Sequence, residues 1–423
     1  MDSNWTNLLP SKAKEVAAES NQLVFWALEG AWVRADGKTA APTVSGAVNG
    51  SVRTDGKRVT FQIGTEPVSA LTKKAEATNG NMSGTLEDLL KTAVDGDTIT
   101  LNNDVSLTGY NTVTSKITLD LKGYVITIPA KSALSVKGNG NMTITNGKIV
   151  AGQGLSHQMT QVLDGATMTL DRVEMSGGLC VFVSGKETGK KCTLNVINRS
   201  VLDGTETYEA ISTNGLDTKS NHAINIEDST VKGWEALFLT GVTTTTVTNS
   251  TIVGYKNGIS IKAGTLNLVG DTSVEGKGSY KVSGTLSTNG SNETGSAIAV
   301  FEQAPTYAGN IVINVGANVT LKSNAGPEQD GDKPAILALR NGDHSTENAE
   351  KNNTTVTIGG SALTKASNAE DLKKAGVLFY NIAKEDTEDQ GDSQGTTQNT
   401  AESTVSEEDV DVDENVTENT DAE

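Results

Sequence analysis

The stretch KITLDLKGYVITI, residues 116–128, contains seven aliphatic or aromatic residues in thirteen, and their alternation changes phase at Lys122-Gly123. Side chains alternate between the two faces of a strand, so apolar residues at every second position mark one buried face. Before Gly123 these residues are at odd positions, and after it they are at even positions. The residues concerned are Ile117, Leu119, Leu121, Tyr124, Ile126 and Ile128. The chain therefore either reverses into a hairpin at Gly123 or turns a corner and continues with the same face inward.

The composition favours many short strands joined by tight bends. The 423-residue chain has 44 Gly, 7 Pro and only 4% aromatic residues, and its middle is rich in Thr, Asn, Ser and Val. β-Branched residues favour strands, whereas Gly and Asn favour turns. No stretch approaches the apolar length of a membrane span.

Most of the negative charge lies at the C-terminal end. Residues 385–423 contain fifteen Asp or Glu and no Lys or Arg, and removing these fifteen charges from the net −18 leaves −3 for the rest. This polar segment without aromatic residues is predicted to be a disordered acidic tail. A nearly neutral body without a basic patch argues against nucleic-acid binding.

A repeat of about 21 to 30 residues runs through the middle of the chain. Each unit has an apolar residue, a polar turn, a second apolar residue and then Gly. The units begin at 144, 170, 196, 226, 247 and 268. Such short units cannot bury a core alone and must stack on one another. The fixed Leu spacing of leucine-rich repeats and the amphipathic pattern of helical arrays are missing.

The repeat favours a parallel β-helix of about twelve coils over residues 98–384. In that fold Gly123 is a corner, although the hairpin remains an alternative. Asn recurs at one turn of the unit, with Asp at this position in one repeat, and both residues tolerate left-handed backbone angles. These turn residues are Asn146, Asn198, Asp228 and Asn249.

Two further segments flank the predicted solenoid. Residues 84–97 are predicted to form a capping helix, with Thr85 as N-cap and Asp88 at the capping-box position. Residues 1–80 are predicted to form a small α+β attachment region, with a helix at 11–20 and strands at 22–38 and 56–64. Three of the four tryptophans are in it, which fits either docking onto a partner or a self-contained cap.

The sequence DGDTITLNNDV (95–105), followed by ITLDLKGYVITI (117–128), resembles the opening coils of the pectate-lyase-like superfamily of right-handed parallel β-helices. The family includes bacterial surface proteins and bacteriophage fibres. The resemblance covers about residues 84–380 and implies fold rather than activity. It also implies that a trimer is possible.

None of the catalytic motifs of this superfamily can be placed on the predicted solenoid. The polygalacturonase-type Gly-His-Gly, Asp-Asp and Arg-x-Lys motifs are missing, and the one Asn-Thr-Asp (419–421) is in the acidic tail. No Arg-containing motif matches the pectate lyases. The resemblance therefore assigns no catalytic residue.

Two groups of residues remain as candidate binding sites. One is a polar cluster on neighbouring coils, which fits a saccharide-binding or acid/base site, or a surface ion-pair ladder. Its members are Asp171, Arg172, Glu174, Arg199 and Asp203. The other is Trp234 and Tyr255, expected at the position that Gly152, Gly178 and Gly204 occupy in other units. This pair fits either a sugar-stacking platform or an inward-facing stack.

Cofactor and metal sites are not expected. His157, His222 and His344 share no ligand-like spacing. Cys180 and Cys192 are the only cysteines, and they fit either a disulfide or two free thiols.

The favoured function is a non-catalytic bacteriophage fibre or decoration protein that presents a rod to host glycans. The start of the sequence lacks the pattern of a secretory signal, which fits assembly inside a cell or removal of the signal. The alternatives are a bacterial cell-surface or secreted adhesin and, third, a polysaccharide lyase or glycoside hydrolase. Expected partners are host-surface polysaccharides and, through residues 1–80, proteins of the virion or cell envelope.

Overall fold

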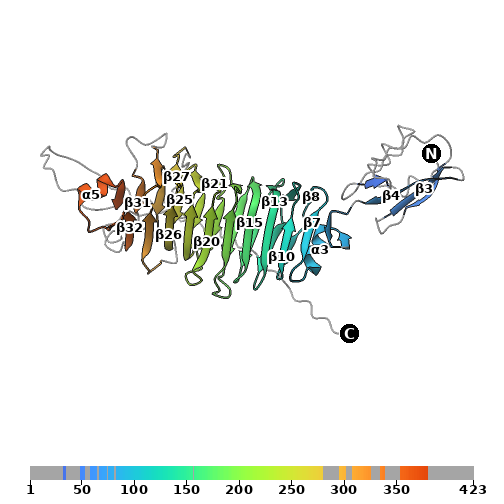
Figure 1. The fold of residues 1–423 in the computed structure, drawn as a ribbon, viewed down its shortest axis with the longest axis horizontal. Helices are drawn as coiled ribbons and strands as arrows, with labels where there is room; N and C mark the ends of the chain where they lie inside the picture. Colours follow the sequence, from blue (N-terminus) through green and yellow to red (C-terminus); the bar gives the residue numbers. More distant parts are fainter. Residues whose placement is uncertain are drawn as a thin grey trace, which may run out of the picture. The chain divides into compact units, whose positions relative to one another are not determined.

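A computed structural model describes residues 75–80, 82–155, 157–279, 295–301, 307–324, 334–338 and 353–379, with the strands at 32–34, 48–52, 58–63 and 66–73. Over the described residues between 98 and 379 the fold is almost entirely β, in long parallel sheets (Figure 1). In that range the chain contributes strands in turn to three parallel ladders, here named A, B and C. One pass is one visit to each ladder.

Ladder A runs through the first strand, or half-strand, of every pass. Its strands are β7 (Thr98–Leu101), β10 (Lys116–Asp120), β13 (Asn141–Ala151), β15 (Thr167–Ser176), β17 (Thr193–Ile197), β20 (His222–Glu227), β23 (Thr243–Thr248), β26 (Gly264–Val269), β29 (Ile311–Val315) and β32 (Thr354–Ile358).

Ladder B contains the second halves of β13 and β15 and a set of short strands. These are β8 (Val105–Ser106), β11 (Val125–Ile128), β18 (Val201–Asp203), β21 (Thr230–Gly233), β24 (Thr251–Gly254), β27 (Ser273–Gly276) and β30 (Thr320–Ser323).

Ladder C is a separate 10-stranded parallel sheet, which gives ten passes in the described residues, fewer than the twelve expected. Its strands are β9 (Tyr110–Val113), β12 (Ala133–Lys137), β14 (Gln158–Leu163), β16 (Leu179–Ser184), β19 (Ile211–Thr213), β22 (Leu237–Leu239), β25 (Ile259–Ile261), β28 (Ile298–Val300), β31 (Ile336–Ala338) and β34 (Val377–Phe379). The parallel ladders are compatible with a β-helix-like solenoid.

Gly123 is a corner, and the hairpin alternative is wrong. Strands β10 and β11, on either side of it, both pair in parallel with the single long strand β13. Lys122 and Gly123 take left-handed backbone angles, with φ of 50° and 86°. The phase change therefore keeps one face inward on both sides of the bend: Ile117, Leu119, Leu121, Ile126 and Ile128 are buried, and Tyr124 packs partly against the core.

Side chains of ladder A sort into an apolar inner face and a polar outer face. Leu119 is fully buried and belongs to a run in which each following pass places an aliphatic residue at the same position, after Ile99 in the first pass. That run continues with Ile144, Leu170, Val196, Ile226, Val247, Leu268 and Val315. Burying a Leu or Ile side chain contributes about 1.5 to 3 kcal/mol, so this repeated column holds the passes together.

One outward position of ladder A is Thr or Asn in every pass. Asn side chains hydrogen-bond from one pass to the next, at 2.9 Å between Asn225 and Asn195 and 2.9 Å between Asn314 and Asn267. Such ladders of amide side chains reinforce a stacked parallel sheet. This outer column is Thr98, Thr118, Thr143, Thr169, Asn195, Asn225, Thr246, Asn267, Asn314 and Thr357.

The two ends of ladder A are covered by short antiparallel strands. At the first pass β5 (Ala77–Asn79) pairs with β7 and with β6 (Met82–Gly84). At the last pass β33 (Ser361–Leu363) pairs with β32. Covering an edge in this way prevents further strands from adding to it.

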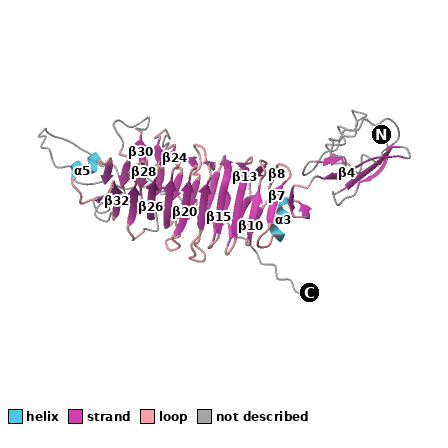
Figure 2. Ribbon diagram, viewed as in Figure 1, coloured by secondary structure: helices cyan, strands magenta, loops and turns pink. Residues whose placement is uncertain are grey.

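Figure 2 shows helix only at α3 and α5 in the described part of the chain. Helix α3 (Leu86–Thr92) has Thr85 as its N-cap, and the Thr85 hydroxyl accepts from the Asp88 backbone N–H, as the sequence indicates. Leu86, Leu89 and Leu90 are buried and join the core. Helix α5 (Ala369–Lys374) precedes the last strand of ladder C.

The region before residue 75 contains a four-stranded antiparallel sheet. Its strands are β1 (Trp32–Arg34), β2 (Val48–Val52), β3 (Arg58–Ile63) and β4 (Glu66–Lys73), in the order β1-β4-β3-β2. Strand β3 agrees with the predicted strand at 56–64, and β1 lies inside the predicted segment 22–38. The predicted helix at 11–20 and the acidic tail at 385–423 lie outside the described residues.

Candidate functional site

The corner between ladders A and B carries a column of residues with left-handed backbone. Asn146, Asn198, Asp228 and Asn249 all have φ between 47° and 58°. Their side chains bond to adjacent passes: Asn146 Nδ2 donates to Asp120 Oδ1 at 3.2 Å, and the Asp271 N–H donates to Asn249 Oδ1 at 3.1 Å. This column confirms the turn inferred from the recurrent Asn.

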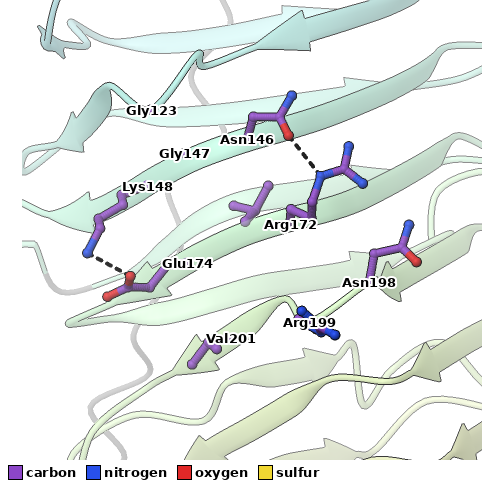
Figure 3. Close-up of a pocket in the computed structure, with 10 residues that line it drawn as sticks. Gly123, Asn146, Gly147, Lys148, Arg172, Glu174, Asn198, Arg199 and Val201 are labelled. Carbon is purple, nitrogen blue, oxygen red and sulfur yellow. Dashed lines mark hydrogen bonds and ion pairs between the residues drawn. The ribbon is translucent and has the colours of Figure 1, made fainter.

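A groove of about 370 Å³ opens on this corner, across four successive passes (Figure 3). Figure 3 shows Lys148 and Glu174 on one side of it and Asn146 and Arg172 on the other, with Arg199 viewed nearly end-on below Arg172. The lining residues are Gly123, Asn146, Gly147, Lys148, Arg172, Val173, Glu174, Asn198, Arg199 and Val201.

Arg172 is anchored by its neighbours on two passes. Its Nε donates to Asn146 Oδ1 at 2.9 Å, and its Nη1 lies 2.9 Å from Asp171 Oδ1. Asp171 Oδ1 also accepts from Asn198 Nδ2 at 2.9 Å. This network fixes the guanidinium at the rim of the groove, with 54% of the Arg172 side chain still exposed.

The carboxylate of Glu174 pairs with Lys148 across adjacent passes at 2.6 Å, and both side chains are about half exposed. Exposed pairs of this kind contribute about 0 to 1 kcal/mol. Because each carboxylate of the groove already has a cationic partner, the site lacks a free acid and base. Its chemistry is that of a hydrogen-bond donor surface.

The predicted polar cluster is therefore only partly brought together. Arg172, Glu174 and Arg199 line the groove and Asp171 supports it. Asp203 is separate, because it is the last residue of β18 and lies beside Ser176. Its carboxylate accepts from the Thr205 backbone N–H at 2.8 Å, which stabilises the following turn.

Trp234 and Tyr255 occupy equivalent positions, since each directly follows one of the paired residues Gly233 and Gly254. Neither ring is an open platform. The Lys256 ammonium lies 4.6 Å from the Trp234 ring centroid, and the Lys277 ammonium lies 4.6 Å from that of Tyr255. Both aromatic residues are half-buried, so their exposure lies between that of a surface platform and that of an inward-facing stack.

The expected alignment of these rings with Gly204 is wrong by one residue. Asp203 lies beside Lys232, so Gly204 follows in register with Gly233 rather than with Trp234. Glycine is required at this position, because a Cβ at Gly204 or Gly254 would collide with the backbone of the turn that follows.

A buried ionic cluster at the corner between ladders B and C is not among the sites predicted from the sequence. Glu235 is fully buried and pairs with Lys256 at 3.2 Å, while Asn257 Nδ2 approaches its Oε1 at 3.4 Å. Glu209 lies at the equivalent position one pass earlier, two residues before Ile211, which pairs with Leu237. Burial raises the pKa of Glu209 to about 7, and the negative charge of Glu235 adds to this effect.

A repeated motif in the sequence carries the signal for this cluster. YEAI at 208–211 and WEAL at 234–237 share the order aromatic, Glu, Ala, aliphatic. The recurrence of this order in two successive passes marks Glu209 and Glu235 as equivalent positions before a core strand. A carboxylate buried there is stable only with a partner, here Lys256.

The cysteines are free and buried, so the disulfide alternative is wrong. Burial raises the pKa of the Cys192 thiol to about 11, and burial also raises that of Cys180 far above its ordinary value. The Cys192 backbone N–H donates to Nδ1 of buried His222, whose Nε2 lies 2.9 Å from Asp217 Oδ2. This triad is closed to solvent and is structural.

No family model, curated protein or solved structure matches the chain. In the described ranges no helix is long and apolar enough to cross a bilayer. Over the same ranges no three His, Cys, Asp or Glu side chains are grouped to hold a metal ion.

Proposed function

We propose that residues 98–384 form a right-handed parallel β-helix of the pectate-lyase-like type that acts as a non-catalytic binding rod. The three parallel ladders support this fold, because stacked passes with one continuous core give a rigid, elongated binding surface. Residues 84–97 cap this rod in the proposal, and residues 1–80 attach it to a larger assembly.

The groove at the corner of ladders A and B carries the functional part of the proposal. It offers guanidinium and amide donors, whereas its carboxylates are already engaged by Lys148, Arg172 and Asn198. Planar and amide donors of this kind bind the hydroxyl and acidic groups of saccharides. The ligand is therefore a surface polysaccharide of a host cell, and the assembly is the exterior of a bacteriophage particle, with a homotrimer as a possible form.

A glycan array and purified envelope polysaccharides, probed with the full chain, test this function. Binding without release of shorter or unsaturated products is the expected result. Cleavage of a bound polysaccharide, or no binding to any glycan, contradicts the proposal. Mass spectrometry of purified particles and of envelope fractions separates the virion protein from the alternative, a bacterial cell-surface adhesin.

One observation favours the lyase or hydrolase alternative. Glu209 and Glu235 are two carboxylates on adjacent passes, and the pKa of Glu209 is raised to about 7 by burial. An acid of that pKa can donate a proton near neutral pH. Glu235, however, is fully buried beside Lys256, which favours a structural role. Polysaccharide turnover that is lost in Glu209→Gln would establish the enzyme.

A further inference from the structure

The left-handed turns at the corner of ladders A and B contain two residues of a type that rarely adopts this backbone, Lys122 and Arg172. Asn, Asp and Gly are the residues that adopt φ near +50° at little cost, and they occupy most of the column. Lys122, with φ of 50°, and Arg172, with φ of 56°, are exceptions, and of these two Arg172 lines the groove. The equivalent residues in the passes before and after Arg172 are Asn146 and Asn198, and both are of the type that favours this backbone conformation.

A second arginine in the next pass is strained in the same way. Arg199 has φ of 66° and directly follows Asn198, which has φ of 57°. Asp171 pairs with Ile197, and Glu174 pairs with Val201, so this pass has one more residue in its corner than the pass before. The extra residue produces the one-residue displacement of Gly204, and it places Arg199 on the outer surface.

Both strained arginines line the same groove. The Arg199 side chain is exposed and makes no hydrogen bond or ion pair with any side chain of the described residues. Arg172 uses Nε and Nη1 for Asn146 and Asp171, and its Nη2 donates a longer hydrogen bond, at 3.4 Å, to Thr145 Oγ1. Strained backbone that persists without a packing reason is concentrated at functional sites. Two strained arginines at one groove therefore indicate that their guanidinium groups have a ligand.

We propose that the groove is an oxyanion site in which Arg172 and Arg199 bind a carboxylate or sulfate group of the host-surface polymer. The inference rests on the proposed glycan-binding function and adds the chemical class of the ligand. A guanidinium presents a planar fork of donors that matches such groups in a bidentate manner. The two nearby carboxylates do not repel the ligand strongly, because Glu174 pairs with Lys148 and Asp171 with Arg172.

Replacement by asparagine separates binding from stability. Arg199→Asn removes the donors and inserts a residue that suits the left-handed backbone, so the variant should be as stable as the wild type or more stable. Its affinity for the charged polymer should fall about 10- to 100-fold, the loss expected for charge-assisted hydrogen bonds. Arg172→Asn should show the same loss of affinity, with a smaller gain in stability because its ion pair with Asp171 is also lost.

The probes are dextran, carboxymethyl dextran and dextran sulfate, which share one backbone and differ in charge. Binding of the full chain is measured by surface plasmon resonance, and stability is measured by calorimetry. Thr205→Asn relieves the same type of backbone, at φ of 65°, outside the groove. Lys322→Gln removes an exposed positive charge elsewhere. Neither control should change binding by more than about twofold.

Arginine-dependent binding of one or both charged dextrans, but not of dextran, supports the proposal and identifies the preferred anion. Arg199→Lys, which retains the charge and the strain but not the fork, should bind more weakly than the wild type. Equal binding by the wild type and both asparagine variants overturns the oxyanion site. If the array glycans are still bound by those variants, the glycan-binding function stands and only the oxyanion site is lost.

Discussion

The substitution Glu209→Gln should remove a specific pH dependence of stability. Glu209 lies half-buried at the corner between ladders B and C, one pass before the ion pair of Glu235 and Lys256. Burial raises the pKa of Glu209 from 4.5 to about 7, and the negative charge of Glu235 raises it further. A hydrogen bond from the Glu209 backbone N–H and the positive charge of Lys256 lower the pKa and offset part of this rise. The folded protein therefore keeps a proton that the unfolded chain releases above pH 4.5.

The raised pKa of Glu209 determines the direction and the size of the change in stability with pH. Stability falls with rising pH wherever the folded state binds more protons than the unfolded state. The contribution of Glu209 is therefore fully present below about pH 4.5, decreases between there and about pH 7, and is constant above that. At 1.36 kcal/mol per pKa unit, the loss over this window is about 3 kcal/mol.

Calorimetry of the full chain from about pH 4 to about pH 8 measures this contribution. The difference in stability between the wild type and Glu209→Gln should change steadily through the window and then level off. Glu227→Gln, which removes an exposed carboxylate of strand β20, is the matched control, and its stability should change with pH in parallel with that of the wild type. If the stability of Glu209→Gln also changed with pH in parallel with that of the wild type, the Glu209 carboxyl would not be held protonated by its surroundings.

Three further predictions concern the fold. Gly254→Ala places a methyl against the backbone of the next turn and should lower the free energy of unfolding by at least about 2 kcal/mol. The control Gly84→Ala, with open space around it, should lower it by less than about 0.5 kcal/mol. Equal effects of the two variants in calorimetry would contradict the close approach at Gly254. Buried Cys180 and Cys192 should resist a thiol reagent until the chain unfolds, and rapid labelling of the native protein would contradict their burial. Leu194→Ala should cost about 2 to 5 kcal/mol in the same calorimetric assay, and a change below about 0.5 kcal/mol would place this residue outside the core.

The corner at Gly123 could be predicted from the sequence because two physical constraints agree there. The phase of the apolar residues changes at a glycine, and a stacked fold requires one face to stay inward through a bend. The recurrent Asn gave the same answer, since Asn146, Asn198 and Asn249 all adopt the left-handed backbone that their side chain tolerates.

What could not be predicted depends on single-residue differences between passes. Arg199 lengthens one corner by a residue, which shifts Gly204 out of the alignment that spacing alone implies. Late passes are also longer, because β27 ends at Gly276 and β28 begins at Ile298, so a mean repeat length gives too many passes. The Glu209 and Glu235 cluster escaped detection because a charged residue before a core strand normally stays in solvent.

The central claim, that successive passes stack in parallel and in register, is tested most directly by electron spin resonance distances along the outer Thr/Asn column. A spin label at Thr143 is paired with a second at Thr246, Asn267 or Asn314, which lie four, five and six passes further along ladder A. At about 4.8 Å per pass, the backbone separations should be about 19, 24 and 29 Å, so label distances should rise by one equal step per pass. Distances that fail to increase in this order, or that increase unevenly, would contradict parallel stacking.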